Sequence, residues 1–130
     1  DRFPSRLELA AGEYAYEPRD VARMVSAGAV DVIQIDATRC CGFTGFLEAA
    51  VIAREHGVPV SAHTAPALHL HVCCAPADLR HIEWFHDHAR VEAMLFEGAP
   101  RPVDGRIRPD LGRPGNGLSV RERDAARFAA

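Results

Sequence analysis

The stretch Val58-Pro-Val-Ser-Ala-His63 is a short apolar run that ends on a histidine, and the rest of the chain can be organised around it. Three other strand-like segments, residues 7–13, 32–36 and 81–83, each end on an acidic residue. The four terminal residues, Glu13, Asp36, His63 and Glu83, follow one another at intervals of 23, 27 and 20 positions. Each interval suits one strand, one helix and two loops, the repeat of a parallel (β/α) barrel. Because the C-terminal ends of barrel strands converge on one mouth, we expect these four side chains to form one site.

The length and composition limit what this segment can be. It has 130 residues, of which 48% are apolar and 25% charged, which is typical of an ordinary globular domain. A complete (β/α) barrel takes about 250 residues, so the sequence predicts about half of one. The net charge of −3 gives no electrostatic reason to expect a nucleic-acid partner. No apolar run approaches the roughly 18 residues of a membrane span, so we expect no membrane partner and a cytoplasmic location.

Two residue types narrow the chemistry further. Every basic residue is an arginine, so this segment can supply no lysine for a Schiff base, a P-loop or general base catalysis. The four cysteines form two adjacent pairs, at positions 40–41 and 73–74, without the two-residue gap of zinc ribbons and redox motifs. The sequence therefore favours small buried thiols in a reducing compartment.

The periodicity of apolar residues predicts two regions. Residues 1–88 form the partial barrel, with strands at 7–11, 30–36, 58–62 and 81–85 and helices at about 17–28, 43–57 and 65–75. Residues 89–130 lack this alternation, and we expect a hairpin around the turn at 103–105, a proline- and glycine-rich loop at 110–117 and a short helix. Ser119 and Glu122 have the spacing of a capping box for that helix. We expect this tail to pack on another domain.

The strand-end residues have complementary chemistry. A histidine beside an aspartate on the neighbouring strand has a fixed tautomer and increased basicity, so Asp36 and His63 can act as a general acid or base. Glu13 offers a hard oxygen ligand of the kind that Mg²⁺ prefers. Glu83 is placed to hydrogen-bond a charged oxygen of a substrate. Arg39 could bind a substrate carboxylate through two nitrogens, although a structural salt bridge is an equally good interpretation.

Taken together, these motifs resemble one family. Gly12-Glu13, Gln34-x-Asp36 followed by Thr-Arg-Cys-x-Gly (38–42), Ser61-x-His63 and Ile-Glu-Trp (82–84) resemble the C-terminal half of the barrel domain in the enolase superfamily, in the mandelate racemase/muconate lactonizing enzyme branch with its acid-sugar dehydratases. The resemblance covers nearly the whole chain. It implies half of a (β/α)₇β barrel and a C-terminal tail that returns to a capping domain.

The resemblance also implies an activity and its residues. Glu13 would be the last of three carboxylate ligands to Mg²⁺, Asp36 and His63 the dyad that moves a proton, and Glu83 a partner of the substrate carboxylate and the enediolate. The substrate would be a small carboxylic acid or sugar acid, dehydrated or racemised, and His86 is a further candidate for contact with it. We also expect a homo-oligomer.

Two features depart from the family pattern. The family usually has two glycines after Thr-Arg-Cys, whereas Cys41 occupies the first of these positions here. The lysine pair, the first two metal carboxylates and the capping domain of the family are not in this segment.

Two other interpretations remain open. The chain could be a truncated, non-catalytic half-barrel whose open sheet edge is buried in an oligomer. It could also be a hydrolase-type barrel that binds zinc through His69-x-His71 or His86-x-His88, although two residues that lie two apart on a helix do not face each other.

Overall fold

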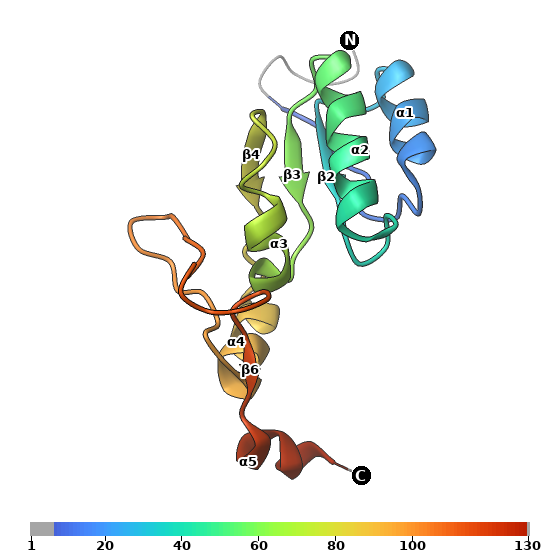
Figure 1. Cartoon of the computed structure of the whole chain (residues 1–130). Helices are drawn as coiled ribbons and strands as arrows, with labels where there is room; N and C mark the ends of the chain where they lie inside the picture. Colours follow the sequence, from blue (N-terminus) through green and yellow to red (C-terminus); the bar gives the residue numbers. More distant parts are fainter. Residues whose placement is uncertain (1–6, 130) are drawn as a thin grey trace. The chain divides into compact units, whose positions relative to one another are not determined.

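The computed structural model describes residues 7–129, which divide by their contacts into two compact units. The first unit is Asp1–His63 with Val72–His81, and the second is Thr64–His71 with Ile82–Ala130. Figure 1 labels their helices and strands. The chain passes from the first unit to the second directly after His63. We describe each unit separately.

A four-stranded sheet is the centre of the first unit. Its strands are β1 (Ala10–Ala11), β2 (Val32–Ile35), β3 (Val60–Ala62) and β4 (Leu79–Ile82), in the order β1-β2-β3-β4. The pairs β1–β2 and β2–β3 are parallel. The side chains of β3 are all buried, as are most of those of β2, which is typical of a parallel strand covered by helices. The predicted parallel α/β architecture is confirmed.

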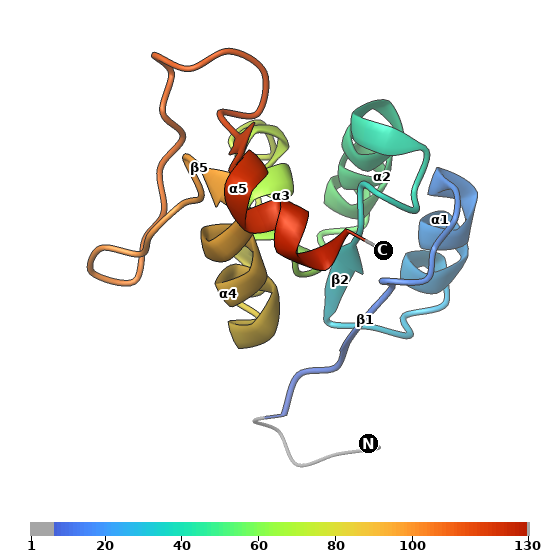
Figure 2. The same cartoon turned by 90° about the horizontal axis from the view of Figure 1, so that it is seen from below.

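Two helices, α1 (Pro18–Ser26) and α2 (Gly42–Glu55), pack side by side against the same face of this sheet (Figures 1 and 2). Pro18 fits the start of α1 because the first helical turn has no use for its missing N–H. Val21 and Val25 of α1 are buried at helical spacing, and Phe46 of α2 is fully buried. These side chains form the core with the strand residues.

The second unit contains shorter elements. They are α3 (Pro66–Val72), α4 (His86–Leu95), the antiparallel pair β5 (Phe96–Glu97) and β6 (Ser119–Val120), α5 (Glu122–Ala125) and the 3₁₀ helix η1 (Ala126–Phe128). Between β5 and β6, Val103 and Arg106 form an isolated antiparallel bridge, with Asp104 and Gly105 at positive φ in the turn. The predicted turn at 103–105 is therefore present.

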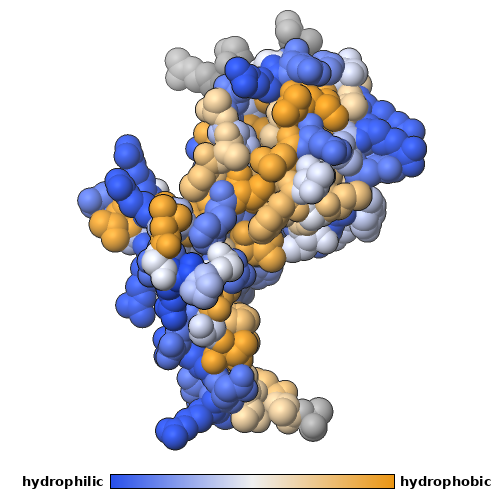
Figure 3. Space-filling model, in the orientation of Figure 1, coloured by the Kyte–Doolittle hydropathy of each residue, from blue (hydrophilic) through white to orange (hydrophobic). Residues whose placement is uncertain are grey.

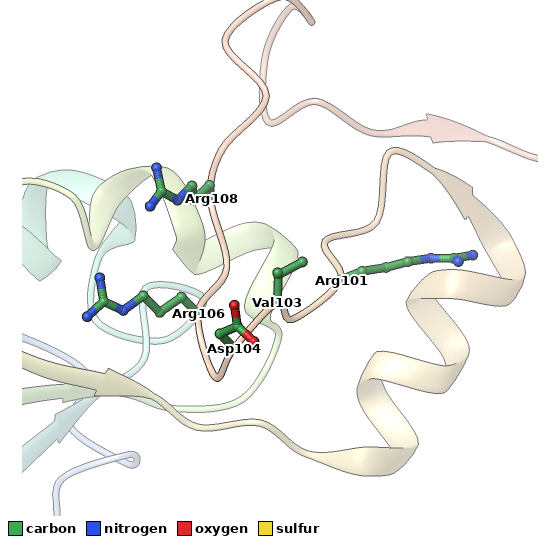
Figure 4. Close-up of a pocket in the computed structure, with 5 residues that line it drawn as sticks. All are labelled: Arg101, Val103, Asp104, Arg106 and Arg108. Atoms are coloured by element: carbon green, nitrogen blue, oxygen red, sulfur yellow. The ribbon is translucent and has the colours of Figure 1, made fainter.

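Three arginines line a cavity of about 460 Å³ at this turn, together with Val103 and Asp104. Figure 4 shows that Arg106 and Arg108 extend to the same side of the chain, whereas Arg101 extends to the other.

The structure differs from the sequence-based expectations at three elements. Helix α4 was not predicted, because none of its residues is buried and it has no apolar stripe to recognise. The last strand of the sheet, β4, begins and ends earlier than the predicted 81–85. Ser119 lies in β6 instead of capping a helix, and α5 has no side-chain cap. The predicted boundary between residues 88 and 89 stays a prediction.

The outer face of α2 is apolar as well as its inner face. Phe43, Leu47 and Val51 follow one another at four-residue spacing and are all exposed. Figure 3 shows apolar side chains gathered over α2 and the adjacent chain of the first unit. Among residues 7–129, no helix is long and apolar enough to cross a membrane.

Candidate functional site

Strand register brings Asp36 and His63 together. Ile35 of β2 is paired with Ala62 of β3, so the next residue on each strand is Asp36 on one side and His63 on the other. The His63 N–H donates to the Ile35 carbonyl at 2.9 Å, which extends the ladder by one bond. The His63 Nδ1 lies 2.9 Å from Asp36 Oδ2. The contact expected from the sequence is present, and its catalytic role stays a prediction.

The Asp36 carboxylate is buried, with 4% of the residue exposed, and both oxygens are hydrogen-bonded. Oδ1 accepts the Thr38 backbone N–H at 2.8 Å and the Thr38 hydroxyl at 2.7 Å. Oδ2 faces His63 and accepts a hydrogen bond from Arg39 Nη1 at 3.2 Å. Because the carboxylate accepts from His63, the imidazole carries its proton on Nδ1, which leaves Nε2 as the nitrogen that can take up a proton.

Arg39 is part of the same cluster. Its Nη1 donates to the Glu13 carbonyl at 3.2 Å and lies 3.3 Å from His63 Nδ1. The guanidinium carbon lies 4.6 Å from the centre of the Tyr14 ring, a cation–π contact. Of the two roles that the sequence left open for Arg39, the structural salt bridge with Asp36 is present. Its binding to a substrate carboxylate stays a prediction.

Glu13 lies two residues after the end of β1 and is partly buried. Its Oε2 accepts the Gly12 N–H at 3.2 Å. Gly12 has a φ of 127°, which only glycine adopts readily, and an added Cβ would lie 2.7 Å from Ile33 Cδ1. The backbone can therefore turn at Gly12, directly before Glu13.

Glu13 has the chemistry of a Mg²⁺ ligand but does not complete a metal site. Within residues 7–129, no group of three His, Cys, Asp or Glu side chains is arranged to hold a metal. Mg²⁺ commonly binds one or two carboxylates together with water and substrate oxygens. Glu13 therefore fits as one ligand of a shared Mg²⁺ site.

Glu83 and His86 belong to the second unit. Glu83 directly follows β4, and its Oε2 accepts the Thr64 backbone N–H at 3.2 Å. His86 begins α4 with a side chain that is 89% exposed, and its Nδ1 lies 3.4 Å from Asp87 Oδ1. The roles of Glu83 and His86 in substrate binding stay predictions.

His69 is a residue whose place the sequence did not reveal. It is fully buried on α3, and its Nδ1 lies 3.0 Å from the Thr64 carbonyl and 3.2 Å from the Ala65 carbonyl. Thr64 and Ala65 have φ values of 42° and 37°. One sequence signal was available, because a residue before proline avoids the right-handed helical conformation and Ala65 precedes Pro66. The geometry of His69 gives no support to a zinc site at His69-x-His71.

Two cysteines are buried beside these elements. Burial, together with the nearby charge of Cys41, raises the pKa of Cys40 to about 11. Burial likewise raises the pKa of Cys73 to about 12. Both thiols are therefore neutral at physiological pH. Cys41 and Cys74 are exposed, so the expectation of small buried thiols is correct for one cysteine of each pair and wrong for the other.

Comparisons with known proteins agree with this geometry. The sequence model of the family described as "Enolase C-terminal domain-like" matches residues 2–125. The chain is 33% identical over 93 residues to the L-talarate/galactarate dehydratase of Salmonella typhimurium, a match that covers 69% of this chain and 23% of that protein.

Solved structures show the same relationship. A mandelate racemase/muconate lactonizing enzyme-like protein from Rubrobacter xylanophilus is 47% identical, with a TM-score of 0.93 over 100% of this chain and 36% of that one. L-Talarate dehydratase from Polaromonas sp. JS666, solved with Mg and L-glucarate, is 28% identical, with a TM-score of 0.80 over 93% of this chain and 32% of that one. The chain thus spans about a quarter to a third of the length of these relatives.

Proposed function

Because the chain belongs to the enolase C-terminal domain-like family and resembles its acid-sugar dehydratases, we propose that it supplies the general acid–base pair of an enzyme that removes the proton next to a substrate carboxylate. The product of that step would be an enediolate. The reaction would be the dehydration of an acid sugar, with racemisation as the alternative outcome of the same proton transfer. The observation that carries the proposal is the 2.9 Å contact between His63 and the buried carboxylate of Asp36.

The pair can perform both halves of a dehydration. With Nδ1–H directed at Asp36, the free Nε2 of His63 would take the proton from the α-carbon on its face of the substrate. The buried Asp36 carboxylate, held by Thr38 and Arg39, would stabilise the imidazolium that forms. The protonated His63 would then give its proton to the β-hydroxyl as it leaves. In a racemase, the same imidazole would either remove or deliver the α-proton on its face, and a second group would act on the opposite face.

The remaining predicted residues would act on the carboxylate of the substrate. A bound Mg²⁺ would supply Lewis-acid charge for the developing enediolate, and Glu13 would provide one of its oxygen ligands. Glu83 would hydrogen-bond a carboxylate oxygen of the substrate through the O–H of its carboxylic acid form. The Mg and L-glucarate present in the Polaromonas sp. dehydratase structure support a hard cation and an acid-sugar substrate.

The proposal is tested with the full-length protein that carries this chain. Turnover of an acid-sugar panel with Mg²⁺, and exchange of the α-proton in D₂O followed by NMR, would be measured for the wild type, His63→Asn and Asp36→Asn. We expect both variants to lose about 10²–10⁴-fold in turnover, the usual contribution of a general acid or base. His56→Asn is the matched control, because His56 caps the far end of α2 and contacts Ser26 and Ile52. A folded His63→Asn variant with wild-type turnover would refute the assignment.

A second candidate is a non-catalytic half-barrel that is stable in an oligomer. The exposed stripe of Phe43, Leu47 and Val51 on α2 favours it, because exposed apolar patches often mark interfaces. It predicts an oligomer by light scattering that neither binds Mg²⁺ in calorimetry nor turns over any acid sugar.

We also propose that residues 89–130 return to a capping domain.

A further inference from the structure

We propose that His69 is a positioning residue for His63, because it holds the strained turn Thr64–Ala65 that directly follows His63. The catalytic meaning of this inference depends on the proposed function, since it takes His63 as the proton carrier. The geometry on which it rests is independent of that function.

The turn needs an external restraint. Thr64 and Ala65 are successive residues with side chains, and both have positive φ, where a Cβ approaches the backbone too closely. Such conformations persist only where the surrounding structure determines them. Thr64 is 5% exposed, so water does not satisfy its backbone groups.

His69 provides that restraint from the first helix after the turn. The carbonyls of Thr64 and Ala65 can only accept hydrogen bonds, so Nδ1 of His69 must carry the proton and donate to them at 3.0 and 3.2 Å. The ring is fully buried, which strengthens these bonds relative to an exposed site. The Ala65 carbonyl also accepts the backbone N–H groups of Leu68 and His69, at 3.0 and 3.1 Å, so the imidazole matters most for the Thr64 carbonyl.

Two carboxylates hold the neighbouring amides. Glu83 Oε2 accepts the Thr64 N–H at 3.2 Å, and both carboxylate oxygens of Glu92 lie 3.3 Å from the Ala67 nitrogen. Their partners are N–H groups at or just after the turn, whereas the partners of His69 are the carbonyls of the turn itself. Loss of the His69 imidazole would leave the Ala65 carbonyl bonded to the first turn of α3 but would remove the hydrogen bond to the Thr64 carbonyl.

The effect on His63 follows from the chain direction. The backbone of His63 is bonded to the sheet through its N–H and the Ile35 carbonyl. On its other side, the next peptide group belongs to the strained turn. If Thr64 relaxes to an ordinary φ, the backbone at His63 rotates, and the 2.9 Å contact with Asp36 is no longer favoured. A shift of about 1 Å in a catalytic group can cost about 10²-fold in rate.

The test compares two amide substitutions in the full-length protein. His69→Asn places an amide nitrogen two bonds from Cβ, as Nδ1 is, whereas His69→Gln places its amide one bond further out. We expect His69→Gln to lower kcat about 10- to 100-fold with KM changed less than about twofold, and His69→Asn to stay within about threefold of the wild type. Equal losses in the two variants would overturn the proposal.

Ala65→Gly provides a second, independent measurement. Glycine adopts positive φ without strain, so a turn that contains it needs less restraint. We expect Ala65→Gly to recover most of the activity lost in His69→Gln. If His69→Gln does not fold, recovery of both folding and turnover in the double variant supports the proposal, and failure to recover either one overturns it.

A spectroscopic measurement separates this inference from the proposed function. Long-range ¹H–¹⁵N spectra of the histidine rings report the environment of His63 without any substrate. If no acid sugar is turned over, the proposed function fails, but a displaced His63 ring signal in His69→Gln that returns in His69→Asn still supports the positioning role. An unchanged His63 signal in folded His69→Gln overturns that role, whatever the activity.

Discussion

Replacement of Cys41 by glycine is expected to stabilise the protein. Cys41 is the N-cap of α2 and has φ 54° and ψ 37°, the left-handed conformation. The resemblance to the enolase superfamily implies a glycine at this position. The loop keeps the positive φ that favours glycine although Cys41 carries a side chain. The thiol gives little in return, since the residue is exposed and its Sγ–H donates a weak hydrogen bond to the Tyr16 carbonyl at 3.3 Å.

The size of the effect follows from two opposing terms. A side chain in the left-handed region costs roughly 1–2 kcal/mol. Glycine loses more backbone freedom on folding, which costs roughly 0.5–1 kcal/mol. The free energy of unfolding should therefore rise by about 0.5–1 kcal/mol in Cys41→Gly. With an m-value of about 2 kcal/mol/M, the midpoint of urea denaturation should rise by about 0.3–0.5 M.

The assay is urea denaturation followed by far-ultraviolet circular dichroism, with Cys41→Ala as the matched control. Alanine removes the thiol but keeps Cβ, so it retains the backbone strain and should bring no gain. If Cys41→Gly is no more stable than Cys41→Ala, the strain at this position does not limit stability and the reasoning is refuted.

Two further predictions concern stability. Gly12→Ala should lower the free energy of unfolding by about 2–4 kcal/mol in the same assay. The φ of 127° at this position disfavours a side chain, and the new Cβ would lie 2.7 Å from Ile33 Cδ1 and 2.8 Å from the Gln34 carbonyl. An unchanged denaturation midpoint would contradict this. The pKa values of Cys40 and Cys73 are raised from the ordinary 9.0 to about 11 and about 12, so the folded state keeps protons that the unfolded thiols release. Their contribution to stability should be full below pH 9 and decline as the pH rises through 9 to 12. Denaturation midpoints at pH 8, 9.5 and 10.5 would show this decline, and an equal decline in a variant with alanine at both positions would argue against it.

The sheet and the Asp36–His63 contact could be predicted from the sequence because both depend on simple patterns. Short, continuously apolar runs mark buried parallel strands, and the residue after each run lies at the same edge of the sheet. The observed register places Ile35 beside Ala62, so the polar residues that follow meet without any special loop conformation. The spacing in the sequence was therefore enough to predict that Asp36 and His63 lie side by side.

The place of Arg39 could not be predicted in the same way. Its contacts depend on the path of the loop between β2 and α2, where Cys41 takes a left-handed conformation. That path directs the guanidinium to Asp36 and the Glu13 carbonyl. Sequence spacing alone left a substrate ligand and a structural salt bridge equally possible.

Helix α4 and the contacts of His69 were missed for other physical reasons. No residue of α4 is buried, so the helix has no apolar face that a periodicity argument could detect. His69 looked like half of a His-x-His pair, but its environment is made by backbone carbonyls of residues at positive φ, which no residue-type pattern indicates.

The attachment of Asp36 and His63 to adjacent, hydrogen-bonded strands has a consequence for protein engineering. Their separation is set by the repeat distance of the ladder, which differs little from one parallel barrel to another. A pair of neighbouring strands carrying these two residues, with the Thr38 loop that anchors the carboxylate, is therefore a module for placing an imidazole against a buried carboxylate in another barrel. For the proposed reaction, a host barrel would need to supply the substrate pocket and the ligands of the Mg²⁺.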